Sequence, residues 1–386
     1  MNRRKMLQSG LGWLVANRAR AFEDKTPEGM VHIPAGEFVM GSPSAEGGGP
    51  AGRGGPGRGS RTDNRHVVKL SDFYIGKYLV TNAEYKLFCD AAGSRYRPSG
   101  NRRDGGGSYW DNPQFDWSEK ANHPVLFVGY DQAMAYCKWL SVKITWTVTL
   151  PSEAQWERAA RGQTKTGEEF EYPWGNATGP DDYKDRLNYN VLCAVKSGIS
   201  RDIAGNTYPF WPFVVEKRQG SSIASNFKGV VYGEEDDRTA DIRESSDEVK
   251  TVWSKIMSKG GYTTPVGAYP PGPSGCFDMA GNAFEWTRDF STVSSYLRLA
   301  EKTVDPCMDD VAALTAEDLR SGSDGMHGGP GAGDDGRPTK VIRGGSWYAN
   351  ESSCKAARRS ETRTPGGGGY HSVGFRVVAT SERRAD

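Results

Sequence analysis

Short runs of apolar, β-branched and aromatic residues predict β-strands near both ends of the chain. The N-terminal runs follow one another closely and are separated by turn residues such as Pro34-Ala35-Gly36, so we expect them to pair as hairpins. These runs cover 31–33, 37–40, 67–70 and 73–75, and two further strand fragments cover 341–343 and 374–378.

Apolar residues at three- and four-residue spacing predict three short helices between these strands. Each begins near a polar residue, and two end at a glycine. The first follows Thr81, with Glu84 completing a capping box, and ends at Gly93; the second begins at Asp131 and buries Met134, Tyr136 or Cys137, and Leu140; the third follows Ser152, with Gln155 and Trp156, and ends at Gly162. Few helices, short strands and long connections indicate an α+β chain with small antiparallel sheets and a high loop content.

Glycine is the unusual feature of the composition. The chain has 49 glycines among 386 residues, roughly twice the usual ~7% share, which predicts many loops and turns. The segments 47–60 and 321–338 contain almost no apolar residues, so we expect both to be surface loops inserted between ordered elements.

The charges of the chain balance almost completely. It has 49 Lys and Arg against 48 Asp and Glu, a formal net charge of +1, so we expect no nucleic-acid partner. With a mean hydropathy of -0.65 and no long apolar run, we expect no membrane span. Arg3-Arg4 begins a twin-arginine-like signal, so export is the alternative to the cytoplasmic location that we favour.

The turn over residues 278–286 holds the densest group of potential ligands. Two carboxylates, Asp278 and Glu285, flank it, and the carbonyl groups of Gly281 and Ala283 could converge with them on one Ca²⁺ ion, which prefers oxygen ligands. The alternative is that Asp278 and Asn282 cap the turn and that Glu285 pairs with a nearby arginine. The sequence has no HExxH, phosphate-loop, GxSxG or CxxC motif that would indicate a common catalytic or zinc site.

Ten short segments form one ordered set of motifs along the chain. They are MVHIPAGEF at 30–38, VTNAEY at 80–85, HPV at 123–125, AYCKWL at 135–140, LPSEAQWE at 150–157, YPWG at 172–175, TPVG at 264–267, DMAGNAFEW at 278–286, RGGSW at 343–347 and GFR at 374–376. In this order they resemble a formylglycine-generating-enzyme (sulfatase-modifying factor) domain. The resemblance implies one domain with a variant C-type-lectin fold over 28–380, insertions at about 47–60, 181–261 and 321–338, and tails at 1–27 and 381–386.

The same resemblance bears on metals and on catalysis. It implies a structural calcium site at Asp278, Gly281, Ala283 and Glu285. Catalytic members of the family oxidise a substrate cysteine with copper held by two cysteines, and the positions of these match Ala349 and Cys354 here. Because one thiolate cannot form the two-sulfur site that Cu(I) prefers, we expect no copper and no formylglycine-generating activity. Cys354 would be catalytic only in an enzyme alternative.

The C-terminal segment also resembles that of the variable proteins of diversity-generating retroelements, in which it forms a diversified ligand-binding surface. Here its loops are rich in Tyr, Ser, Asn and Gly, a composition that suits adaptable contacts. We predict that the ligand, a protein or another macromolecule, contacts Trp347, Tyr348, Ala349, Asn350, Glu351, Ser353, Gly368, Gly369, Tyr370 and His371. The alternatives are that the glycines form only a flexible loop and that the aromatic residues pack in the core.

The sequence therefore predicts a ligand-binding protein that displays a C-terminal, retroelement-diversified surface on a C-type-lectin scaffold. The alternative is an oxidoreductase of the same superfamily, either formylglycine-generating or an iron-dependent sulfur-oxidising oxygenase. The replacement of one copper-binding cysteine by Ala349 favours the ligand-binding function over the enzyme.

Overall fold

A computed structural model describes most of the predicted elements. The described residues are 26–42, 65–99, 108–113, 115–162, 170–177, 182, 186–189, 202–203, 206–207, 263–291, 304–314, 339–347, 349, 351–362 and 369–380. The tails 1–25 and 381–386 lie outside them, as do most of the three predicted insertions.

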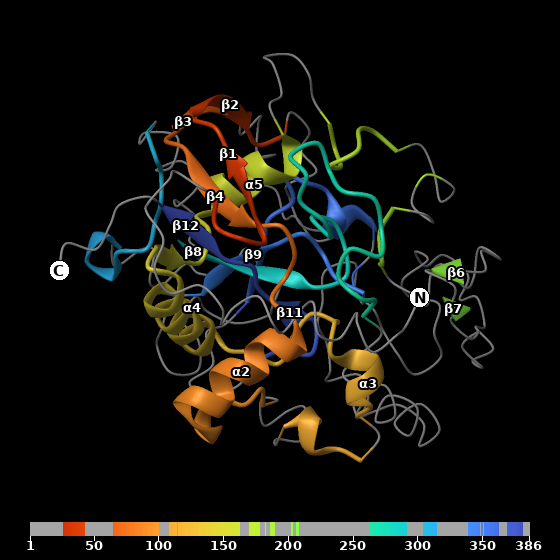
Figure 1. Cartoon of the computed structure of the whole chain (residues 1–386). Helices are drawn as coiled ribbons and strands as arrows, with labels where there is room; N and C mark the ends of the chain where they lie inside the picture. The colour runs from red at the N-terminus through yellow and green to blue at the C-terminus, as the bar shows by residue number, and fades with distance from the viewer. Residues whose placement is uncertain are drawn as a thin grey trace, which may run out of the picture.

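The described strands and helices are short and alternate with loops (Figure 1). The strands are β1 (Met30–Ile33), β2 (Gly36–Met40), β3 (His66–Leu70), β4 (Phe73–Gly76), β5 (Thr147–Thr149), β6 (Asp202–Ile203), β7 (Asn206–Thr207), β8 (Phe284–Phe290), β9 (Lys340–Arg343), β10 (Ser360–Thr362), β11 (Val373–Gly374) and β12 (Val378–Thr380). The α-helices are α2 (Asn82–Ala92), α3 (Trp117–Lys120), α4 (Tyr130–Ile144) and α5 (Glu153–Arg161), and the 3₁₀ turns are η2 (Ser94–Tyr96), η4 (Tyr109–Asp111), η6 (Val311–Ala313) and η7 (Glu351–Cys354).

The strands form two sheets of four, in the orders β1-β4-β12-β5 and β10-β9-β8-β11, and the two-stranded ladders β2-β3 and β6-β7. The expectation of hairpins is confirmed for β2 and β3, which are consecutive and antiparallel, but it is wrong for β1, which pairs with β4 instead of β2. Pro34 lies between β1 and β2 and has no N–H with which to continue a ladder, so the chain leaves the first sheet there. Among the strand pairs described, β11 with β8 is parallel and the others are antiparallel.

The three predicted helices are confirmed. Helix α2 has Thr81 as its N-cap with the complete capping box to Glu84, and its C-cap is Gly93. Helix α4 begins one residue before the predicted start and buries Tyr136, Cys137 and Leu140, whereas Met134, which was predicted to be buried, is only half-buried. Helix α5 has the capping box between Ser152 and Gln155 and ends at Gly162. Each cap satisfies backbone groups that the first helical turn leaves without an intrahelical partner.

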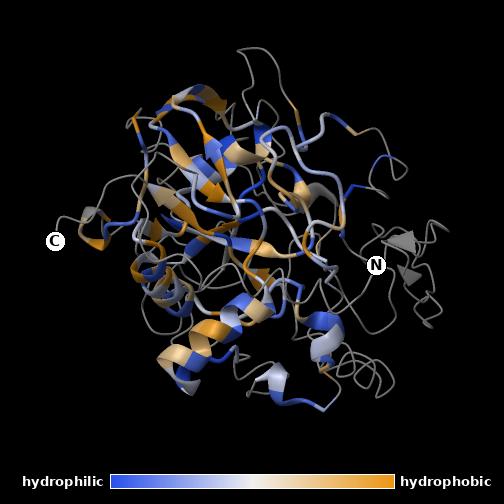
Figure 2. Ribbon diagram, viewed as in Figure 1, coloured by the Kyte–Doolittle hydropathy of each residue, from blue (hydrophilic) through white to orange (hydrophobic). Residues whose placement is uncertain are grey.

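Two main clusters of buried side chains form the core. One packs α2 and α4 against strands of both four-stranded sheets and includes Tyr85, Tyr136 and Trp286; the other joins β2, β3 and β4 to α5 through Trp156. Figure 1 shows α2 and α4 close together at the lower side of the view, and Figure 2 shows apolar and polar residues interspersed along these elements. In the part of the chain that the structure describes, no helix has the length and apolar character needed to cross a membrane.

Candidate functional site

The predicted metal-binding turn and the predicted ligand segment lie against each other. The Gly281 N–H donates to the carbonyl oxygen of Gly344 over 2.6 Å, and the Trp347 N–H donates to that of Asn282 over 3.1 Å. We call residues 278–285 and 343–347 the joined turns. The sequence predicted both segments separately, and the structure brings them together at the start of β8 and the end of β9.

Asn282 holds the joined turns to two other segments. It has φ of 67°, a left-handed conformation that asparagine adopts more readily than most residues. Its side-chain amide accepts from Thr264 N–H over 3.0 Å and donates to the Thr264 carbonyl over 3.2 Å, and its own N–H donates to the Asn188 carbonyl over 2.6 Å. The alternative that Asn282 caps its own turn is therefore wrong, because its side chain bonds to the TPVG segment; no sequence signal indicated Asn188.

Glu285 is fully buried and pairs with an arginine, as the alternative interpretation of its spacing proposed. Arg376 donates Nε to Glu285 Oε2 over 2.6 Å and an Nη to Oε1 over 2.7 Å, and Trp156 Nε1 donates to Oε2 over 2.9 Å. Arg376 also donates to the carbonyl groups of Gly76 and Phe277. The guanidinium and the carboxylate therefore satisfy each other inside the fold, which is the condition for burying such charges.

Asp278 is the group of the turn that is left incompletely bonded. It has φ of 54°, and its Oδ2 accepts from Gly267 N–H over 2.8 Å, but its Oδ1 is buried and has no hydrogen-bond partner among the described residues. Burial raises the pKa of Asp278 to about 6, although the Gly267 hydrogen bond and the Arg376 charge oppose the rise. An unpartnered buried carboxylate oxygen is costly unless a cation or a proton meets it.

The four residues of the predicted calcium site therefore differ in how well they fit an ion. Asp278 Oδ1 is available, whereas both oxygens of Glu285 already accept hydrogen bonds and the carbonyl of Gly281 accepts from Ala283 N–H over 2.9 Å. Among the described residues, no three His, Cys, Asp or Glu side chains gather as metal ligands. A calcium ion here would depend on Asp278 and backbone oxygens, and Glu285 would have to share its carboxylate with Arg376.

The start of the first predicted ligand loop, at Trp347, contacts the end of the second, at His371. Trp347 Nε1 donates to the carbonyl of His371 over 3.2 Å, and the two rings lie 5.9 Å apart between centroids. Next to them, Phe284 N–H donates to the Ser372 carbonyl over 2.9 Å, where β11 pairs with β8. These contacts hold both loops beside the start of β8.

The structure separates the predicted ligand-contacting residues into three groups. Trp347, Ser353, Gly369 and His371 are buried, so these four lie beneath the surface and hold the loops rather than present side chains to a partner. Ala349 and Tyr370 are half-buried, and Glu351 lies in η7. Tyr348, Asn350 and Gly368 lie outside the described residues.

Cys354, at the position of the second family cysteine, lies inside the fold. It is fully buried in a cluster with Tyr172, Leu187 and Tyr189. No disulfide joins the described cysteines. Ala349, at the position of the first family cysteine, donates its N–H to Ser346. The described site therefore offers one buried sulfur and no second thiolate at the matching position.

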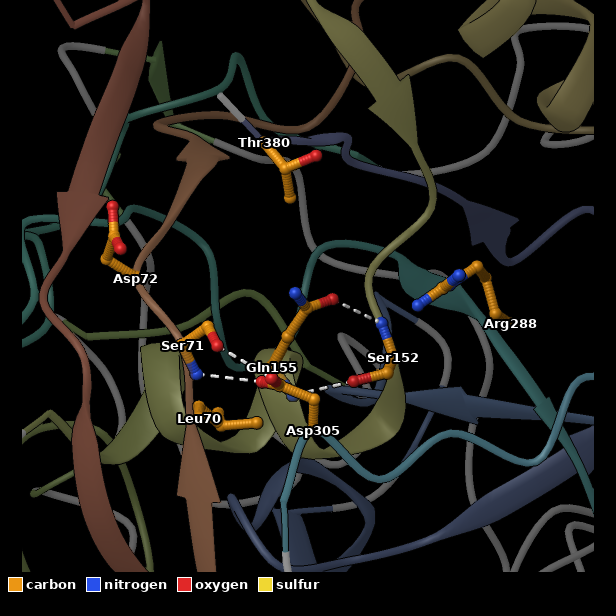
Figure 3. Close-up of a pocket in the computed structure, with 8 residues that line it drawn as sticks. All are labelled: Leu70, Ser71, Asp72, Ser152, Gln155, Arg288, Asp305 and Thr380. Atoms are coloured by element: carbon orange, nitrogen blue, oxygen red, sulfur yellow. Dashed lines mark hydrogen bonds between the residues drawn. The ribbon is translucent and has the colours of Figure 1, made fainter. Parts of the chain in front are cut away.

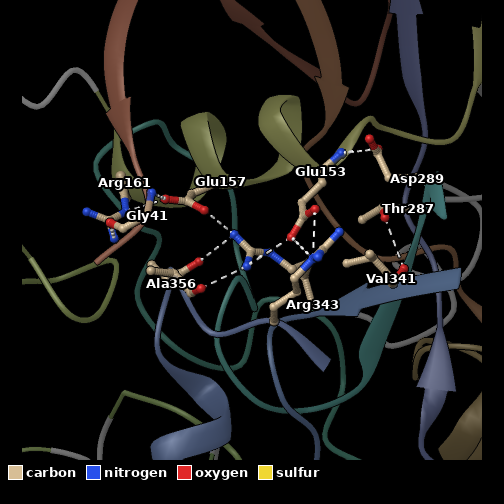
Figure 4. Close-up of polar contacts among 11 residues, drawn as sticks. Gly41, Glu153, Glu157, Arg161, Thr287, Asp289, Val341, Arg343 and Ala356 are labelled. Atoms are coloured by element: carbon tan, nitrogen blue, oxygen red, sulfur yellow. Dashed lines mark hydrogen bonds and ion pairs between the residues drawn. The ribbon is translucent and has the colours of Figure 1, made fainter. Parts of the chain in front are cut away.

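A buried ion network supports the joined turns from α5. The guanidinium of Arg343 lies between the carboxylates of Glu153 and Glu157, one helical turn apart (Figure 4). It also donates to the carbonyl groups of Ala356 and Ala357 over 3.1 and 3.0 Å. The sequence showed Arg343 only as the start of a motif, and the helical spacing of the two glutamates was the signal that could have indicated a shared cation.

Comparison with known proteins agrees with this architecture. Residues 16–200 and 218–381 match the sulfatase-modifying factor enzyme 1-like domain. The formylglycine-generating enzyme of Streptomyces coelicolor is 26% identical over 93% of this chain and 91% of its own length. PvdO from Pseudomonas aeruginosa has a TM-score of 0.52 at 20% identity over 91% of this chain and 93% of its own, and Treponema denticola variable protein 1 has 0.46 at 17% over 92% and 95%. The family match and the likeness to PvdO confirm the predicted α+β, C-type-lectin-like fold.

Proposed function

Since the chain belongs to the sulfatase-modifying factor enzyme 1-like domain family but carries Ala349 at one of the two copper-binding positions, we propose that it is a ligand-binding member of that family. Its ligand surface would be the exposed part of the loops that follow Trp347 and precede Ser372. The partner would be a protein or another macromolecule.

The contact between Trp347 and His371 carries this proposal. It joins one end of each loop beside the start of β8, so residues next to these two anchors start from defined positions. Ala349 and Tyr370 are the described neighbours with exposed surface. A rigid frame beneath short loops of Tyr, Asn, Ser and Gly is the arrangement that suits adaptable recognition, because the frame limits the ordering entropy lost on binding.

We further propose that these loops are diversified by a retroelement. The burial of each residue then predicts which positions should vary and which should stay constant. Sequencing the last 50 or so codons of the gene across many isolates of one population should show substitutions concentrated at Tyr348, Ala349, Asn350, Gly368 and Tyr370. Trp347, His371 and the segments 343–346 and 374–376 should remain constant, because they are buried and hold the frame.

Two outcomes would contradict this proposal. A uniform segment across isolates would exclude diversification, and substitutions equally frequent at Trp347 and His371 would exclude the division between buried frame and exposed surface.

The alternative function, an oxidoreductase, is favoured by the 26% identity to a formylglycine-generating enzyme over most of both chains. Stoichiometric copper or iron binding together with oxygen consumption on adding a cysteine peptide would establish that alternative, and Cys354→Ala should then abolish both.

We also propose a structural Ca²⁺ ion at the joined turns, held by Asp278 with the carbonyl groups of Gly281 and Ala283 and with Glu285. The unpartnered Oδ1 of Asp278 supports it. The ion would supply no reaction chemistry. It would bind the one oxygen of the buried Asp278 carboxylate that otherwise lacks a partner.

The expected result is that saturating Ca²⁺ raises the melting temperature of EGTA-treated protein by about 3 °C. About 2.7 kcal/mol is gained at 100 times Kd, and an unfolding entropy of about 2.1 cal/mol/K per residue makes each kcal/mol worth roughly 1 °C in a chain of 386 residues. Asp278→Asn should remove the shift while keeping the left-handed backbone, and Asp90→Asn on the exposed face of α2 should not. A wild-type protein indifferent to Ca²⁺ would exclude the site, and a shift retained in Asp278→Asn would exclude Asp278 as its ligand.

A further inference from the structure

A polar cavity of about 350 Å³ lies between the β3–β4 turn, the start of α5 and the end of β12 (Figure 3). Its lining consists of Leu70, Ser71, Asp72, Ser152, Gln155, Arg288, Asp305 and Thr380, of which Leu70 alone is apolar. None of these residues belongs to the joined turns or to the predicted ligand loops. The volume lies at the lower end of the ~300–1,000 Å³ typical of small-molecule sites.

Several acceptor groups of the lining are already engaged by the protein. Gln155 Oε1 accepts from Ser152 N–H over 2.9 Å, as part of the capping box of α5. Asp305 Oδ1 and Oδ2 accept from the N–H and the hydroxyl of Ser71 over 2.8 and 2.7 Å. These bonds fix the orientation of the Gln155 and Asp305 side chains without any ligand.

Some hydrogen-bond donors of the lining residues, unlike these acceptors, are open to a ligand. Because Gln155 Oε1 binds Ser152, its amide nitrogen is turned into the cavity, as Figure 3 shows. Arg288 also lines the cavity, but its Nε is buried and offers no surface to a ligand. The hydroxyl of Ser152 accepts from Gln155 N–H over 3.2 Å and keeps its own proton to donate. The cavity thus presents a fixed amide donor beside hydroxyl groups that can donate or accept.

The charges around the cavity argue against an anionic ligand. The Arg288 guanidinium is already paired with Asp309 at 3.1 Å, and Asp72, at the rim, is only 3.6 Å from His32 Nε2. The carboxylates of Asp72 and Asp305 would both repel a phosphate or a carboxylate. A hydroxyl group has neither problem, because it accepts from the amide donor and donates to a carboxylate.

We propose that this cavity binds a small uncharged polyhydroxyl compound, a monosaccharide or a cyclitol. Gln155 Nε2 donates to one of its hydroxyl oxygens, Asp72 accepts from one hydroxyl, and Ser152 and Thr380 complete the set as hydroxyl partners. This binding site is independent of the proposed ligand loops.

The test is an NMR titration of the full chain with myo-inositol, D-glucose and glycerol, and separately with inorganic phosphate and acetate. We expect a cyclic polyol to bind with a Kd in the millimolar range, about 1–10 mM. Gln155→Glu keeps the capping-box acceptor but removes both amide donors, and Thr380→Val removes a hydroxyl with little change in shape. Each should weaken binding about five- to tenfold, the effect of one lost hydrogen bond.

The chain supplies a matched control for the first variant. Gln132 occupies the same capping-box position in α4, where its Oε1 accepts from Gly129 N–H over 2.9 Å. Gln132→Glu should leave polyol binding unchanged, and a similar melting temperature in both variants would exclude a folding effect. The proposal is overturned if neither cyclic polyol binds at about 100 mM, if phosphate or acetate binds more tightly, or if Gln155→Glu and Thr380→Val bind like the wild type.

Discussion

Arg376→Met is expected to lower the free energy of unfolding by about 3–5 kcal/mol, measured by urea denaturation. The substitution removes both hydrogen bonds to Glu285 and leaves that carboxylate fully buried beside Trp156. It also removes the donors to two backbone carbonyl groups, those of Gly76 and Phe277. The cost comes mainly from the stranded charge, because a buried ion that loses its partner keeps its desolvation penalty.

A second variant distinguishes the stranded charge from lost packing. Arg376→Met combined with Glu285→Leu removes both charges, so the double variant should be more stable than Arg376→Met alone. Lys86→Met provides the exposed comparison: its pair with Asp90 spans 2.6 Å, but both side chains are about half exposed, and the loss should stay below about 1 kcal/mol. If the double variant is as unstable as Arg376→Met alone, the stranded carboxylate is not the cause of the loss, and lost packing is.

The helices could be predicted from the sequence because their signals are local. Thr81 and Glu84, and likewise Ser152 and Gln155, satisfy each other's backbone groups across three positions, so a single window of sequence contains the whole cap. The strand segments were also visible, but their partners were not. β12 enters between β4 and β5, and no local pattern indicates that a C-terminal strand completes an N-terminal sheet.

In the candidate site, too, the local turn could be predicted from the sequence but its distant partners could not. The spacing of Asp278 and Glu285 marked a turn with two carboxylates, and it left open whether a metal or an arginine would meet them. Arg376 meets Glu285 from 91 positions away, and Asn188 meets Asn282 from a segment that carried no motif. The composition of the ligand loops likewise could not separate Trp347 and His371, which bind each other inside the fold, from neighbours such as Tyr370 that keep exposed surface.

Gly345→Ala should destabilise the fold by about 2–5 kcal/mol, because two costs add at this position. Gly345 has φ of 71°, where an L-residue with a Cβ loses roughly 1–2 kcal/mol. The new Cβ would also overlap Cys354 Sγ and lie 2.9 Å from Cys354 Cα, and overpacking of this kind costs typically 1–3 kcal/mol. Urea denaturation of the variant measures the sum.

Gly275→Ala isolates the backbone term, since Gly275 has φ of 87° but its nearest neighbour to a new Cβ, Val31, is 3.9 Å away. It should lose only about 1–2 kcal/mol. Adding Cys354→Ala to Gly345→Ala removes the overlapping sulfur and should recover part of the loss, because the contact with Cα remains. Equal losses at Gly345 and Gly275 would mean that Cys354 does not press on the Gly344-Gly345 turn.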